Sequence, residues 1–344
     1  MNKIFFLAII LVALMLNACN NNENDNVCKN SEAFGTLSIG ESGYIELLYP
    51  LSINSSISNQ IVSLIHEGLV KFDAASLTIK PGLADRWEID KDETTYRFFL
   101  NTNAYFHPDK CFKNGKSRKV TAQDVLFSLT RLCTQSPENK AYALLVEQVK
   151  GAKEFYDSKK TTGNIEGFIV ENDSTFVIKL TKPNPMFLHF LANPAASIIA
   201  KEAYEMYNTS LTNGIGPFML HSFPENNKPL VLIRNPHYFK LDRKGNCLPY
   251  LDTVKIYFVG SMKAQLEMLK NGQLDVVLNI DNETFTSFLE ENVKLFEGEK
   301  AVFKAIADQN QSRQHIVNSK VENFILNEQG IFDLSEVKLK KDSL

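Results

Sequence analysis

The sequence has 344 residues, a formal net charge of -3 and 44% hydrophobic residues. This composition allows one large domain or two medium domains with buried cores. The basic cluster near the C-terminus, at Lys338, Lys340 and Lys341, is small and terminal, so a solvated tail is favoured over a binding patch. Composition and charge therefore give no support to a nucleic-acid partner.

The first nineteen residues have the pattern of a lipoprotein signal peptide. Lys3 gives a positive start, residues 4–16 are apolar, and Leu16-Asn17-Ala18-Cys19 ends in small residues before a cysteine. A membrane-spanning helix needs about 20 apolar residues, so this run is too short to span. In the bacterial lipoproteins that this N-terminus resembles, cleavage follows lipidation of the cysteine. We expect Cys19 to anchor the protein outside the cytoplasm, in the periplasm or at the cell surface; an ordinary cysteine is the alternative.

Residues 20–33 are polar and rich in asparagine, so we expect a flexible tether between the lipid and the folded body. The remaining cysteines are Cys28, Cys111, Cys133 and Cys247, which allow three pairings in a compartment where disulfides persist. We favour Cys111 with Cys133, which flank one loop-to-helix unit, and Cys28 with Cys247, which would pin the tether to the body. Free, buried thiols are the alternative. No cysteine or histidine pair has zinc-ligand spacing, so no metal site is expected.

From residue 34 the chain alternates strands and helices. Apolar residues with a period of two, or in short β-branched runs, predict strands at 35–39, 87–90, 95–100, 105–107, 168–171, 175–180, 218–223, 230–234, 253–259 and 274–280. Apolar residues at helical spacing predict helices at 57–69, from Thr121, at 142–155 and at 262–269. Thr121 with Asp124 three residues later is a capping-box pattern. The strand, helix and strand between 253 and 280 predict a parallel crossover.

Catalytic motifs are missing from the sequence. It contains no Gly-x-Ser-x-Gly elbow, no glycine-rich phosphate loop, no His-Glu-x-x-His and no dinucleotide fingerprint. The six histidines are scattered among apolar or aromatic neighbours, where packing is the favoured role. We therefore expect no enzyme activity and no cofactor.

Seven segments, in this order, resemble the family 5 extracellular solute-binding proteins, which include oligopeptide, dipeptide and nickel binders. The segments are Glu67-Gly68-Leu69-Val70, Pro81-Gly82-Leu83-Ala84-Asp85-Arg86-Trp87-Glu88, Val120-Thr121-Ala122-Gln123-Asp124-Val125, Gly151-Ala152-Lys153-Glu154-Phe155, Gly214-Ile215-Gly216-Pro217-Phe218, Arg234-Asn235-Pro236-His237-Tyr238-Phe239 and Asn271-Gly272-Gln273-Leu274-Asp275. The resemblance implies an α/β protein with a type II periplasmic-binding-protein-like fold. It also implies a small peptide or similar solute as ligand, and an ABC permease with its ATPase subunits as partners.

The family fold has two lobes, and here the second lobe is expected to be short. Residues 34–252 would form a nearly complete first lobe, with a strand-rich subdomain at about 70–165. Residues 253–296 would be a stub of the second lobe, and 297–344 would return to the first lobe. The closing strands are expected at Gln314–Asn318, Val321–Asn327 and Asp333–Val337.

Two segments are candidate ligand contacts. In Gly40-Glu41-Ser42-Gly43-Tyr44, small residues leave backbone groups open and Tyr44 offers an apolar plate with a polar tip. Glu41 could pair with a ligand ammonium group, or have a capping or solvent role. In Gly214-Ile215-Gly216-Pro217, the glycines permit close approach of another segment, and the resemblance places this turn near the cleft.

The sequence thus predicts an extracytoplasmic component of an ABC importer that binds a solute without catalysis. The alternative is a truncated remnant, or an interaction lipoprotein that docks a protein on its exposed lobe face.

Overall fold

The computed structural model describes residues 35–225, 228–297, 301–307, 314–325 and 333–340. The expected signal peptide, the lipidation site Cys19, the tether and Cys28 lie outside the described residues. None of the helices in the described ranges is long and apolar enough to cross a membrane.

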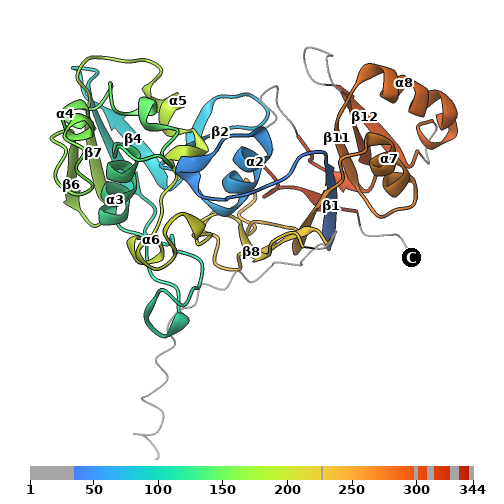
Figure 1. The fold of residues 1–344 in the computed structure, drawn as a ribbon, viewed down its shortest axis with the longest axis horizontal. Coiled ribbons are helices and arrows are strands. Elements are labelled where there is room, and N and C mark those ends of the chain that lie inside the picture. The colour runs from blue at the N-terminus through green and yellow to red at the C-terminus, as the bar shows by residue number, and fades with distance from the viewer. Residues whose placement is uncertain (1–34, 226–227, 298–300, 308–313, 326–332, 341–344) are drawn as a thin grey trace, which may run out of the picture. The chain divides into compact units, whose positions relative to one another are not determined.

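A seven-stranded sheet with β1 near its centre organises the body (Figure 1). Its spatial order is β12 (Phe303–Ala307), β13 (Gln314–Asn318), β11 (Val276–Ile280), β1 (Thr36–Glu41), β10 (Thr253–Phe258), β9 (Leu230–Arg234) and β8 (Phe218–Ser222). β1 is parallel to both β10 and β11, whereas the outer pairs are antiparallel. The predicted crossover between 253 and 280 is confirmed, with the difference that β1 lies between its two strands.

Helices cover both faces of this sheet. They are α2 (Ser56–Ile65), α7 (Met262–Lys270) and α8 (Asn282–Glu291). The apolar face of α2 carries Ile61, Leu64 and Ile65 into one core, together with Leu37 and Ile39 of β1. Burying each such side chain contributes about 1.5–3 kcal/mol. A smaller core on the other face joins α7 and α8 to β11, β12 and β13, and in Figure 1 these helices lie beside β11 and β12.

A second, antiparallel sheet forms the strand-rich part of the body. Its order is β4 (Ala84–Ile89), β5 (Thr95–Leu100), β7 (Thr175–Lys179) and β6 (Phe168–Asn172). Short two-stranded sheets pair β2 (Val70–Phe72) with β3 (Ile79–Pro81) and β14 (Val321–Glu322) with β15 (Lys338–Leu339). The remaining helices are α3 (Ala122–Leu132), α4 (Ala152–Asp157), α5 (Phe187–Leu191) and α6 (Lys201–Tyr207). The predicted capping box is confirmed, because Thr121 and Asp124 bond to each other's backbone at the start of α3.

Several expected elements differ from the structure. Within the described residues, the expected strand Val321–Asn327 is only the two-residue β14, because the backbone leaves the extended conformation at Asn323 (φ 60°). The expected helix over 142–155 is a short 3-10 turn followed by α4, because Gly151 takes a left-handed backbone conformation (φ 78°) that interrupts the helix. Residues 105–107 form only an isolated bridge between Tyr105 and Lys119. Residues 333–337 form a turn held by the Asp333 carboxylate, which accepts from Ser335, and not a strand.

The predicted disulfide between Cys111 and Cys133 is wrong, because both cysteines are free. Cys133 lies at the end of α3, about 16 Å along the helix from the point where the loop containing Cys111 enters it. Disulfides join α-carbons less than about 7 Å apart. Cys247 is disulfide-bonded, whereas Cys28 lies outside the described residues, so the pairing of these two stays a prediction.

The two thiols should also be unreactive in the folded protein. Burial raises the pKa of Cys111 to about 12, helped by its contact with Asp109, and burial alone raises the pKa of Cys133 far above its usual value. Both therefore stay protonated near neutral pH, and thiols react as thiolates. With a maleimide under non-reducing conditions, we expect Cys133 to be labelled only after denaturation. Labelling of neither thiol after denaturation would show that they are disulfide-bonded.

Candidate functional site

The loop after β1 lies at the carboxyl edge of three parallel strands. β1 ends at Glu41 beside Phe258 of β10, and β11 runs parallel on its other side. In open α/β sheets, ligands bind outside the carboxyl ends of the strands, where connections diverge to opposite faces. Here α2 follows β1 on one face, and α7 follows β10 on the other. The segment from Glu41 to Tyr44 therefore occupies the place where this fold class binds its ligands.

Glu41 is a buried carboxylate in an apolar row. Its side chain is 5% exposed, and by strand alternation it lies on the same face of β1 as Leu37 and Ile39. Its Oε1 atom has no hydrogen-bond partner among the described residues. Burial raises the pKa of Glu41 to about 7, although a hydrogen bond from the backbone N–H of Ser42 works in the opposite direction. The group can thus hold a proton or accept a hydrogen bond from a cationic donor.

The rest of this loop is exposed at the edge of the sheet. Tyr44 is 73% exposed and Leu47 is 40% exposed. Gly43 packs so closely on α2 that a Cβ atom there would lie 2.3 Å from Cδ1 of Ile57. The structure therefore brings a buried carboxylate, an open backbone and an exposed aromatic ring together within four residues.

Gln265 of α7 is a residue of this region that the sequence reasoning missed. Its side chain is fully buried, and its amide nitrogen donates to Ser42 Oγ at 2.9 Å and to the carbonyl oxygen of Val259 at 2.6 Å. A sequence signal did exist. Gln265 occupies one position of the stripe formed by Met262, Leu266 and Leu269, at spacings of three, four and seven residues. A polar residue in such a buried stripe needs hydrogen-bond partners.

The turn Gly214-Ile215-Gly216-Pro217 is buried and packs on the carboxyl end of α2. A Cβ atom at Gly214 would lie 2.0 Å from the carbonyl oxygen of Ile65, so the predicted close approach of another segment is confirmed. His107 fixes the turn, because its ring atoms contact the Gly214 N–H at 3.2 Å and the Gly216 carbonyl oxygen at 2.9 Å. These contacts give the turn a packing role, and ligand contact at this turn stays a prediction.

The two predicted ligand segments do not meet. Gly43 contacts Ile57 near the start of α2, whereas Gly214 and Gly216 contact Ile65 at its end. These positions are eight residues apart, which is about 12 Å along a helix. A ligand that contacts both segments would have to extend along the length of α2.

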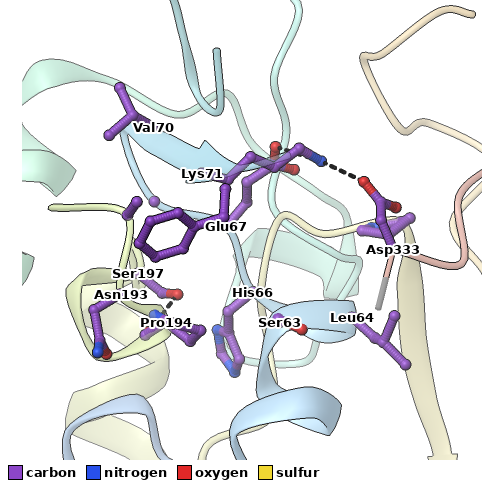
Figure 2. A pocket seen from close by; sticks show the side chains of 14 residues that line it. Ser63, Leu64, His66, Glu67, Val70, Lys71, Asn193, Pro194, Ser197 and Asp333 are labelled. Atoms are coloured by element: carbon purple, nitrogen blue, oxygen red, sulfur yellow. Dashed lines mark hydrogen bonds and ion pairs between the residues drawn. The ribbon is translucent and has the colours of Figure 1, made fainter. Parts of the chain in front are cut away.

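A cavity of about 60 Å³ lies at the carboxyl end of α2 (Figure 2). It is lined by Ser63, Leu64, His66, Glu67, Gly68, Val70, Lys71, Phe72, Ala192, Asn193, Pro194, Ser197, Pro217 and Asp333. This volume accommodates a few water molecules, while ligand pockets commonly have about 300–1,000 Å³. The cavity is therefore too small to be a peptide site.

The polar wall of this cavity is an ion network that holds the segment after residue 332. Lys71 Nζ lies 3.3 Å from Asp333 Oδ2 and 3.4 Å from Glu67 Oε1, and Figure 2 shows it reaching across to Asp333. Tyr238 donates to Glu67 Oε2 at 2.8 Å. Burial alone would raise the pKa of Asp333, but Lys71 and Lys80 hold it well below its usual value. These charges satisfy one another, which indicates a structural role.

Comparison with known proteins agrees with this architecture. The model of the family described as bacterial extracellular solute-binding proteins, family 5 Middle, matches residues 78–327, which make up most of the chain. The chain belongs to this family. Its α/β fold is that of periplasmic binding proteins, as the sequence resemblance implied.

The matched part of this chain covers about half of each of these relatives, or less. The dipeptide-binding protein of Escherichia coli is 27% identical over 222 residues, covering 62% of this chain and 38% of that protein. The periplasmic oligopeptide-binding protein OppA of Salmonella typhimurium is 26% identical over 252 residues, covering 71% and 43%. A solved oligopeptide-binding protein of Borrelia burgdorferi superposes with a TM-score of 0.64 at 22% identity, covering 79% and 51%. The chain therefore spans about half the length, or less, of the proteins it matches.

The buried histidines predict how stability depends on pH. Burial lowers the pKa of His66 to about 3, and its ring nitrogens have no hydrogen-bond partners among the described residues. The unfolded chain binds a proton at His66 below pH 6.5 and the folded protein does not, so stability falls as the pH decreases from 6.5 toward 3. Between pH 6.5 and 4, the free energy of unfolding should decrease by about 3 kcal/mol because of His66.

Replacing His66 with leucine should flatten that decrease without loss of stability at neutral pH. Chemical denaturation of wild type and His66→Leu across pH 4–7 measures the difference. The exposed His221 supplies a control, since His221→Leu should leave the pH dependence unchanged. Parallel pH curves for wild type and His66→Leu would contradict the assignment.

Proposed function

We propose that this protein captures a small peptide, or a similar solute with a cationic amino group, outside the cytoplasm and delivers it to an ABC permease. The segment Glu41–Tyr44 is the ligand contact in this proposal, and capture involves no catalysis. An N-terminal lipid on Cys19 would keep the protein near the membrane that holds the permease and its ATPase subunits. The disulfide between Cys28 and Cys247 would tie the tether to the body.

The observation that carries the proposal is the unpaired carboxylate oxygen of Glu41 at the carboxyl edge of β1. A buried carboxylate oxygen without a hydrogen-bond donor costs stability, and groups with such perturbed pKa values are concentrated at functional sites. A ligand ammonium group would supply the missing donor and form a charge-assisted hydrogen bond. The ring of Tyr44, which is mostly exposed, could then cover the apolar part of the ligand.

The family relationship supports a solute of this kind. Relatives bear the names dipeptide-binding protein, di/tripeptide-binding protein and oligopeptide-binding protein. One related solved structure contains the peptide STSA. Peptides share a terminal ammonium group and a backbone that can bond with open loop groups, so Glu41 and its neighbours match the general features of a peptide.

A second candidate function is docking of a protein partner on the same face. It is favoured by the exposure of Tyr44 and Leu47, which lie close together in sequence at the edge of the sheet. In that case binding would depend on these apolar side chains and not on the charge of Glu41.

The variant Glu41→Gln separates these functions. The folded protein holds a proton at Glu41 up to about pH 7 and the unfolded chain only up to about 4.5, so Glu41 costs stability as the pH rises through this range. Above pH 7, the free energy of unfolding of Glu41→Gln should therefore exceed that of wild type by up to about 3 kcal/mol. It should also bind free-amine peptides about 10 to 100 times more weakly, because a hydrogen bond to a charged group is worth about 1.5–3 kcal/mol.

Isothermal titration with one peptide and its N-acetylated form measures the effect, with Glu46→Gln in the same loop as the exposed control. If Glu41→Gln leaves the preference for the free amine unchanged, the assigned ammonium contact is wrong.

A further inference from the structure

Gln265 joins two loops that meet at the carboxyl edge of the sheet. Its amide group donates both of its hydrogen bonds across this junction, to Ser42 after β1 and to Val259 after β10. Ser42 and Gln265 are 223 residues apart in sequence. This contact therefore ties the start of the body to the helix that opens the expected second-lobe stub.

The contact also reaches Glu41, although Glu41 and Gln265 lie on opposite faces of β1. Gly40 faces α7, since a Cβ atom there would lie 2.7 Å from Gln265 Oε1, so the next residue points to the face that α2 covers. The link between the faces is Ser42. Its hydroxyl accepts from Gln265 at 2.9 Å, and Ser42 directly follows Glu41 in the chain, where its backbone N–H acts to lower the pKa of the Glu41 carboxyl.

From this chain of contacts we infer that Gln265 is a positioning residue for ligand binding: it holds Ser42 so that the Glu41 carboxylate keeps its place at the carboxyl edge. The inference rests on the proposed function for the ligand, but the positioning itself can be tested without one. Gln265 touches no ligand in this account and acts only through Ser42.

Gln265 is an energetically unfavourable residue for its buried position. Gln265 is fully buried, and its Oε1 atom has no hydrogen-bond partner among the described residues. An apolar residue of similar size would avoid the free-energy cost of this unpaired oxygen. Leu266 and Leu269 of the same helix fill the core beside it. Glutamine at this position therefore costs stability. A positioning role explains why the residue is present despite that cost.

The test uses the full chain with Gln265→Leu and with Gln265→Glu, which keeps the size but lacks the amide donors. Asn139→Leu is the matched control. Asn139 is also a buried amide that donates two 2.8 Å hydrogen bonds to backbone carbonyl oxygens, at Leu132 and Thr134, in the other sheet's core. The first readout is the titration of Glu41 by carboxyl-carbon NMR, assigned with Glu41→Gln, without ligand.

If Gln265 positions Glu41, the loop is released in both Gln265 variants and the carboxylate gains water, so its pKa falls from about 7 toward 4.5. Asn139→Leu leaves this titration unchanged, even if it lowers stability as much. An unchanged Glu41 titration in a folded Gln265 variant overturns the inference. If Gln265→Leu does not fold, Gln265→Glu decides the outcome.

The second readout is the affinity ratio of a free-amine peptide to its N-acetylated form, which should fall at least tenfold in the Gln265 variants only. A wild type that binds neither peptide contradicts the proposed function, while the titration still decides whether Gln265 positions Glu41. If the affinity ratio in the Gln265 variants equals that of wild type while the pKa of Glu41 is shifted, the part of the inference that concerns ligand binding is overturned.

Discussion

The parallel pairing of β1 with β10 and β11 is the constraint on which the rest of the body depends. β1 is a short strand from the start of the described chain, inserted between two strands that follow more than half the sequence later. Asp275 secures the insertion, because its carboxylate accepts from the Ser38 N–H at 2.8 Å and its own N–H donates to the Ser38 carbonyl oxygen at 2.7 Å. Closing so long a loop costs only slightly more entropy than closing a short one, so six residues of pairing and two cores can outweigh it.

The same insertion creates the candidate site. On the face of β1 that α2 covers, the row of side chains is apolar at Leu37 and Ile39. Glu41 continues this row as a buried carboxylate with a raised pKa. Residues that cost stability in their local environment are expected at functional sites. Glu41 is therefore a stronger candidate for a functional residue than the ions around Lys71, which are paired with one another.

Local patterns predicted local structure well. The Thr121 and Asp124 pair identified the start of α3, and the glycines at 214 and 216 predicted a close backbone approach, because each signal needs only a few neighbouring residues. The disulfide between Cys111 and Cys133 was predicted wrongly, since nearness in sequence across an eleven-residue helix does not mean nearness in space. The partners of Gln265 could not be predicted, because Ser42 is remote in sequence and only the sheet order brings it near. The strand β12 and helix α8 were also missed; Phe288 is the one buried side chain of α8, whereas α7 buries three side chains.

The family relationship and the site agree on solute capture, but the chain spans about half the length of its relatives or less. The measurement that tests the central claim most directly is therefore thermal unfolding of the chain with and without a mixed-length peptide library. Ligand at a hundred times its dissociation constant adds about 2.7 kcal/mol to the free energy of unfolding. The account predicts a cooperative transition that moves to higher temperature with peptides. A transition that no peptide moves would contradict it, and would leave the family and the fold without the proposed function.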